Sequence, residues 1–125
     1  MDYRKLYQDI MDLDSNIRLV TICDKNGNVA YSDHRGGVKN LLTQEESMKS
    51  LELAITAWRT RSQLAPKIGK GKYVLAEYEK IKRITIPLSN DPESHLVYIT
   101  TEPQADHLEI IQGVGRLVIR KTLKF

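Results

Sequence analysis

A single long helix separates two groups of β-type segments in this sequence. Thr43 and Glu46 are spaced as a capping box, in which each side chain bonds the other residue's backbone amide. We expect a helix from Thr43 to about Leu64, ended by Pro66 and Gly69. Its apolar positions follow helical spacing and are Met48, Leu51, Ala54, Ile55 and Trp58. The strands on either side of this helix then define the fold class.

Two β-type segments precede the helix and three follow it. They are rich in β-branched and apolar residues and cover residues 17–23, 29–32, 72–79, 81–88 and 95–101. The first two are joined by Asp24–Asn28, whose Asn-Gly pair is a strong hairpin signal. Residues 89–93 are expected to form a turn, and Pro87 indicates a strand end or an edge.

Two further helices complete the chain. Residues 2–13 carry apolar side chains at spacings of three and four. The last helix is expected to have Pro103 in its first turn and to run to about Lys121, with a core stripe at Leu108, Ile111, Val114 and Val118. The order α-β-β-α-β-β-β-α predicts an α+β fold with a single five-stranded antiparallel sheet and helices on both faces. We expect one domain over residues 1–121 and a tail over residues 122–125.

Composition limits the class of protein. The chain has 125 residues, 41% of them hydrophobic and 28% charged, which suits one globular domain. Its one cysteine, Cys23, excludes an internal disulfide framework. No apolar run approaches the ~20 residues of a membrane span, and the N-terminus has no signal-peptide core. We therefore expect a cytoplasmic protein without an integral membrane segment.

The order of elements resembles the roadblock/LC7 domain family, a relative of the longin and profilin-like folds. The resemblance covers about residues 2–121, and its landmarks are the Asp24–Asn28 turn, the long helix from Thr43 and the strands that follow it. It implies a noncatalytic platform that forms homodimers or paralogue heterodimers and binds or regulates a small Ras-like GTPase. In that family, sheets join edge to edge and second helices pack antiparallel.

Two groups of residues are candidates for such contacts. Segment 73–79 has hairpin signals on both sides, and an unpaired strand edge can join another sheet. The predicted dimer interface is Tyr73, Leu75, Glu77 and Tyr78. The mixed-charge face of the long helix suits a partner surface or water, and its residues are Glu45, Lys49, Glu52, Thr56 and Arg59.

The sequence shows no catalytic, cofactor or metal site. His34, His95 and His107 have no pair at helical i, i+4 spacing, and we expect them in loops or at a helix start, in water. Cys23 is expected to be buried and inert, because Asp24 beside it raises the thiol pKa. Segment 68–72 has glycines and lysines but not the spacing of a phosphate-binding loop.

Two alternative functions remain open. A profilin-like or PAS-like domain could use a free sheet face to enclose a small molecule. A nucleic-acid module is suggested by eight basic residues between positions 59 and 83, although they carry no recognised RNA-binding motif. Their residues are Arg59, Arg61, Lys67, Lys70, Lys72, Lys80, Lys82 and Arg83.

Overall fold

The computed structural model describes residues 2–88 and 95–122. Within them the elements follow the predicted order. They are α1 (Tyr3–Met11), β1 (Ile17–Cys23), β2 (Val29–His34), α2 (Gln44–Ile68), β3 (Val74–Glu77), β4 (Lys82–Pro87), β5 (Leu96–Thr101) and α3 (His107–Thr122). None of the helices in these ranges is long and apolar enough to cross a membrane. The predicted turn at 89–93 lies outside the described residues.

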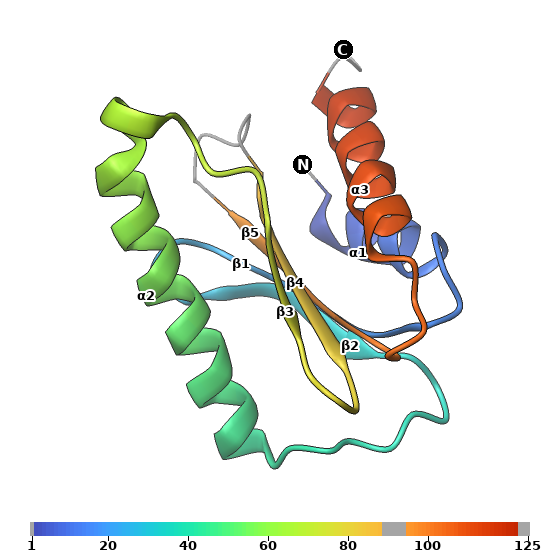
Figure 1. Cartoon of the computed structure of the whole chain (residues 1–125). Coiled ribbons are helices and arrows are strands. Elements are labelled where there is room, and N and C mark those ends of the chain that lie inside the picture. Colours follow the sequence, from blue (N-terminus) through green and yellow to red (C-terminus); the bar gives the residue numbers. More distant parts are fainter. Residues whose placement is uncertain (1, 89–94, 123–125) are drawn as a thin grey trace.

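The five strands form one antiparallel sheet in the order β2-β1-β5-β4-β3. This confirms the predicted α+β fold. The central strand is β5, which pairs with β1 along nearly the whole length of both strands. All six residues of β5 are buried, as expected for a strand covered on both faces. Helix α2 covers one face alone, whereas α1 and α3 lie together on the other (Figure 1).

The main hydrophobic core lies between the sheet and the α1–α3 pair. Strand alternation sends Ile84 and Ile86 into it, as predicted, and Leu88 follows them. The helices contribute side chains at i, i+4 spacing that are fully or almost fully buried. These are Leu6, Ile10, Ile110, Val114 and Val118. Leu108 was predicted to join this core, but it lies outside the i, i+4 row and is half-exposed.

The bounds of α2 and α3 differ from the prediction. Helix α2 continues past Pro66 to Ile68, because the proline removes one backbone bond only and the amide of Gly69 still bonds the carbonyl of Ala65 at 2.8 Å. Gly69 then takes a positive φ of 92°. Helix α3 begins at His107 rather than near Pro103.

The late start of α3 has a clear cause. The Asp106 carboxylate accepts a hydrogen bond from the amide of Glu109 at 3.2 Å, so Asp106 caps the helix. At the other end α3 includes Thr122, the first residue of the predicted tail. Residues 123–125 of that tail lie outside the described residues.

The β1–β2 hairpin is built around Asp24. Its carboxylate accepts bonds from the amides of Asn26 and Asn28, both at 2.9 Å, and from the Asn28 side chain at 3.0 Å. Gly27 has a φ of 89°, which glycine adopts without steric cost. The predicted Asn-Gly hairpin is therefore confirmed. The bonds from Asn28, followed by the bond from Asn26, lower the pKa of the Asp24 carboxyl.

Candidate functional site

The predicted dimer strand lies at one edge of the sheet. Strand β3 pairs with β4 only, so its outer backbone groups face no strand in the described structure. Tyr73 and Tyr78 lie just beyond the ends of β3, and both are exposed. Leu75 is half-buried against the main core, and Glu77 sits opposite Lys82 on β4. The structure thus places two exposed tyrosine rings beside an open strand edge.

The predicted partner-binding face of α2 is open to solvent along its length. Its five residues are exposed, and Lys49 forms an ion pair with Glu45 at 3.7 Å. Arg59 reaches the hairpin and donates to the carbonyl of Lys25 at 3.1 Å. Glu52, Thr56 and Arg59 also border a cavity between α2 and the sheet. The face is therefore partly occupied by contacts of its own chain.

A second surface of α2 was missed by the sequence reasoning. Leu53, Ala57, Leu64 and Ile68 are spaced so that they share one side of the helix, and we call them the outer stripe. Leu53 is 69% exposed and Ile68 is 79% exposed. The spacing is readable in the sequence. The Met48–Trp58 stripe was assumed instead to supply the apolar side of the helix, yet Met48 is exposed.

Helix α2 is held to the sheet by few contacts. Ile55 is its one buried side chain among the described residues, and it packs in a small cluster with Cys23 and Leu96. Two hydrogen bonds between side chains cross the gap. The indole nitrogen of Trp58 donates to the hydroxyl of Thr85 at 2.8 Å, and the hydroxyls of Ser50 and Tyr98 are 2.8 Å apart.

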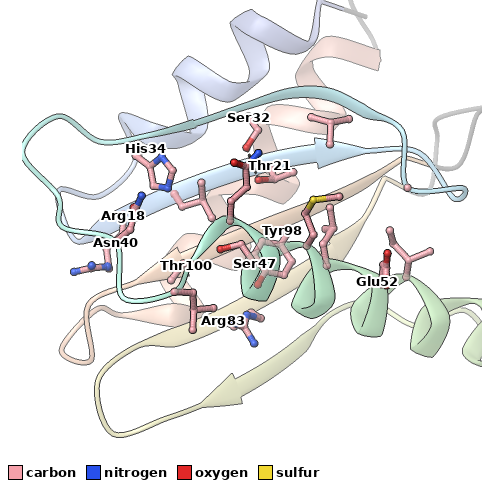
Figure 2. Close-up of a pocket in the computed structure, with 18 of the residues that line it drawn as sticks. Arg18, Thr21, Ser32, His34, Asn40, Ser47, Glu52, Arg83, Tyr98 and Thr100 are labelled. Carbon is pink, nitrogen blue, oxygen red and sulfur yellow. Dashed lines mark hydrogen bonds between the residues drawn. The ribbon is translucent and has the colours of Figure 1, made fainter.

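The sheet face below α2 is polar, unlike the opposite face. It carries a hydroxyl pair, Thr21 and Ser32, at 2.7 Å. A cavity of about 850 Å³ lies between this face, the first half of α2 and the connection that precedes it (Figure 2). Burial raises the pKa of Tyr98, which lines the cavity, and the bond with Ser50 and the charge of Arg83 only partly offset this increase.

Several solved structures share this architecture. The roadblock/LC7 domain from Streptomyces avermitilis matches with a TM-score of 0.70 and 12% identity, over 100% of this chain and 98% of that chain. MglB from Myxococcus xanthus matches with a TM-score of 0.67 and 16% identity, over 98% and 100%. An MglB structure with a tetrameric arrangement matches with a TM-score of 0.73 and 11% identity, over 92% and 81%. The chain has the roadblock/LC7 fold.

The comparison by sequence adds no relative. No protein-family model matches the chain, and no curated protein matches it significantly. The roadblock/LC7 fold is thus shown by structure at identities that carry no information on activity.

The histidines of this roadblock/LC7 fold differ from the prediction in one case. His95 is buried, not in water, and its ring stacks on Tyr3 with centroids 4.4 Å apart. Its Nδ1 lies 3.1 Å from the hydroxyl of Tyr3. His34 is exposed at the end of β2, and His107 opens α3. In residues 2–88 and 95–122, no three His, Cys, Asp or Glu side chains are grouped as metal ligands.

Cys23 agrees with its prediction. It is fully buried at the end of β1, and burial, followed by the Asp24 charge, raises the pKa of its thiol to about 11. A thiol with this pKa is a poor nucleophile at neutral pH.

The fold divides the predicted basic cluster. Lys82 and Arg83 are neighbours on β4, so they point to opposite faces of the sheet. The Lys82 ammonium donates to the carbonyl of Ala105 at 2.8 Å, whereas Arg83 lines the cavity below α2. Arg61 lies over the ring of Trp58 at 5.2 Å. Lys82 and Arg83 therefore do not share one surface.

Proposed function

We propose that this chain is a noncatalytic, cytoplasmic adaptor that dimerises and binds and regulates a small Ras-like GTPase. The observation that carries the proposal is the open edge of β3 beside an α2 with an exposed outer stripe. The roadblock/LC7 fold adds support, since an MglB structure of this fold is described as tetrameric. The dimer can be a homodimer or a heterodimer with a paralogue.

The geometry favours an edge-to-edge dimer. Two β3 edges that pair antiparallel are related by a two-fold axis perpendicular to the sheet. Such an axis continues the sheet and leaves both α2 helices on the same face. The outer stripe lies on the side of α2 opposite Ile55, the side chain that is buried against the sheet, and it is also turned away from Glu52 and Arg59, which border the cavity. We propose that a second α2 packs against this stripe, while Tyr73 and Tyr78 lie at the β3 edges that pair.

The mixed-charge face of α2 is the proposed GTPase surface. Glu45, Glu52 and Arg59 stay exposed when the outer stripe is covered, because they lie on a different side of the helix, whereas Lys49 and Thr56 lie next to Leu53 at the margin of the stripe. Charges of both signs give orientation and association rate to a protein interface. The GTPase would therefore contact the dimer across its two second helices.

The oligomeric state is tested first, with the full chain. Light scattering coupled to gel filtration is expected to give about twice the monomer mass of 14.3 kDa. Leu64→Lys places a charge in the outer stripe and should yield a monomer. The matched control is Leu108→Lys on α3, since Leu64 is 48% exposed and Leu108 is 51% exposed. A wild-type chain that stays monomeric at high micromolar concentration refutes the dimer.

The GTPase is tested by capture from source lysate on the immobilised chain, once with GDP and once with a non-hydrolysable GTP analogue. We expect a Ras-like GTPase to be retained in one nucleotide state. Glu52→Lys should reduce the retention, whereas Glu109→Lys on the exposed side of α3 should not. Retention of no GTPase in either state overturns this part of the proposal and leaves the dimer result standing.

A further inference from the structure

Arg83 brings a positive charge into the cavity below α2 and has no carboxylate partner among the described residues. Its Nε is buried and has no hydrogen-bond partner within residues 2–88 and 95–122. Its Nη1 donates a long bond, of 3.3 Å, to the hydroxyl of Tyr78, and the guanidinium also interacts with the hydroxyl of Tyr98. Buried polar groups of native proteins are nearly always hydrogen-bonded, so the contacts of the described residues leave this guanidinium incompletely satisfied.

Two aromatic rings fix the position of this guanidinium. Arg83 lies over the rings of Tyr78 and Tyr98, at 5.3 Å from each centroid. The hydroxyl of Tyr98 is held in turn by Ser50 on α2. A guanidinium held in this way presents N–H groups in a fixed plane, the geometry that binds a carboxylate through two parallel hydrogen bonds.

The charges around the cavity favour an anion. Among the described residues, the lining includes three arginines, Arg18, Arg59 and Arg83, and only one carboxylate, that of Glu52. Arg18 is already neutralised by an ion pair with Glu102. Figure 2 shows Arg83 beside Tyr98, with Glu52 farther along α2. The excess positive charge near Tyr98 therefore belongs to Arg83.

The rest of the cavity lining suits the uncharged, mainly apolar part of a ligand. The volume of about 850 Å³ lies in the range of small-molecule sites, which is ~300–1,000 Å³. Helix α2 supplies Met48, Leu51 and Ile55 to one side. Leu41 and Leu42, both exposed, lie in the connection that leads into α2. Hydroxyls of Thr21, Ser32 and Thr100 line the sheet side.

We propose that this cavity binds a small organic acid, whose carboxylate accepts hydrogen bonds from Arg83 while its apolar body lies against α2. The site borders the proposed GTPase surface, since Glu52, Thr56 and Arg59 line the cavity, and it shares Tyr78 with the predicted dimer interface. It would also add contacts between α2 and a sheet to which this helix is held by few side chains.

The probes are decanoate and its uncharged amide, decanamide, titrated into the unmodified full chain by calorimetry. They share one apolar chain and differ in the carboxylate. We expect decanoate to bind at least about tenfold more tightly, as hydrogen bonds to a charged group are among the strong ones. Equal affinity of the two probes, or no binding of decanoate at millimolar concentration, overturns the proposal.

A variant then locates the site. Arg83→Gln should weaken decanoate binding by at least about tenfold and leave decanamide unchanged. The matched control is Arg116→Gln, which removes the same charge from the exposed side of α3 and should bind as the wild type does. Unchanged decanoate binding by folded R83Q refutes the role of Arg83. If R83Q does not fold, amide chemical shifts of the wild type decide: changes at Leu51, Arg83 and Thr100 support the site, and changes confined to the outer stripe refute it.

Discussion

Replacing Trp58 by phenylalanine is expected to loosen α2 from the sheet. The indole nitrogen donates to the hydroxyl of Thr85 at 2.8 Å, and Thr85 is buried. Phenylalanine has no donor, so the variant leaves a buried hydroxyl without this partner and also shortens the side chain. A buried polar group left unpaired costs about 1–3 kcal/mol, and we expect a loss of that size in the free energy of unfolding.

A double-mutant cycle isolates the hydrogen bond from the change in size. Thr85→Val removes the acceptor and keeps the shape of the side chain. If the bond contributes as the geometry indicates, W58F and T85V together should cost less than their sum, by about 1 kcal/mol. Urea unfolding of the four proteins measures this coupling.

Hydrogen exchange adds a local readout. Because Ile55 is the one buried side chain of α2 within the described structure, W58F should raise exchange along α2 and leave β5 and α3 protected. Two outcomes would refute the reasoning: strict additivity of the two substitutions, or unchanged protection of α2 in W58F.

Three further results follow from the structure. Gly71→Ala would place a Cβ 2.6 Å from the ring of Trp58, so we expect urea unfolding to show a loss of about 1–3 kcal/mol in the free energy of unfolding. Gly36→Ala should be neutral, because a Cβ there has nothing within 4 Å. Equal effects of the two substitutions would contradict this. Cys23, with a thiol pKa of about 11, should react slowly with a thiol reagent at mildly alkaline pH and rapidly in denaturant; fast native labelling would refute its burial. The pKa of the Asp24 carboxyl is lowered from its ordinary value of 3.8 in the folded protein, so near that pH the unfolded state binds more protons than the folded state. The contribution of Asp24 to stability is therefore lost as the pH falls through the lowered pKa of the folded state. Melting temperatures between about pH 5 and pH 2.5 should therefore fall less for Asp24→Asn than for the wild type, and an identical decrease would count against it.

Local signals accounted for most of the elements. The Thr43–Glu46 capping box is present, with bonds of 2.9 and 3.1 Å, because both partners are three residues apart in one chain. The alternation of Ile84 and Ile86 placed them correctly in the core for the same reason. The predicted start of α3 was wrong, because Pro103 was placed in the first turn whereas the Asp106 side chain caps the helix three residues later.

Candidate surfaces were predicted less completely. Tyr73 and Tyr78 flank an edge strand as expected, since a helix precedes β3 and the strand pairs only with its sequential neighbour, β4. The outer stripe was missed because spacing identifies the sides of a helix but does not say which side is covered. His95 was misplaced because its burial depends on Tyr3, 92 residues away in the sequence.

The sequence by itself determined the helices, the strands, their order and the β1–β2 hairpin, because each depends on residues close together in the chain. Only the tertiary structure decided that β5 is central and that α2 stands alone above a polar sheet face. The cavity below α2 and the unpaired N–H of Arg83 likewise depend on contacts between β1, β4, β5 and α2. Such contacts follow from how the whole chain packs, and no local pattern of residues encodes them.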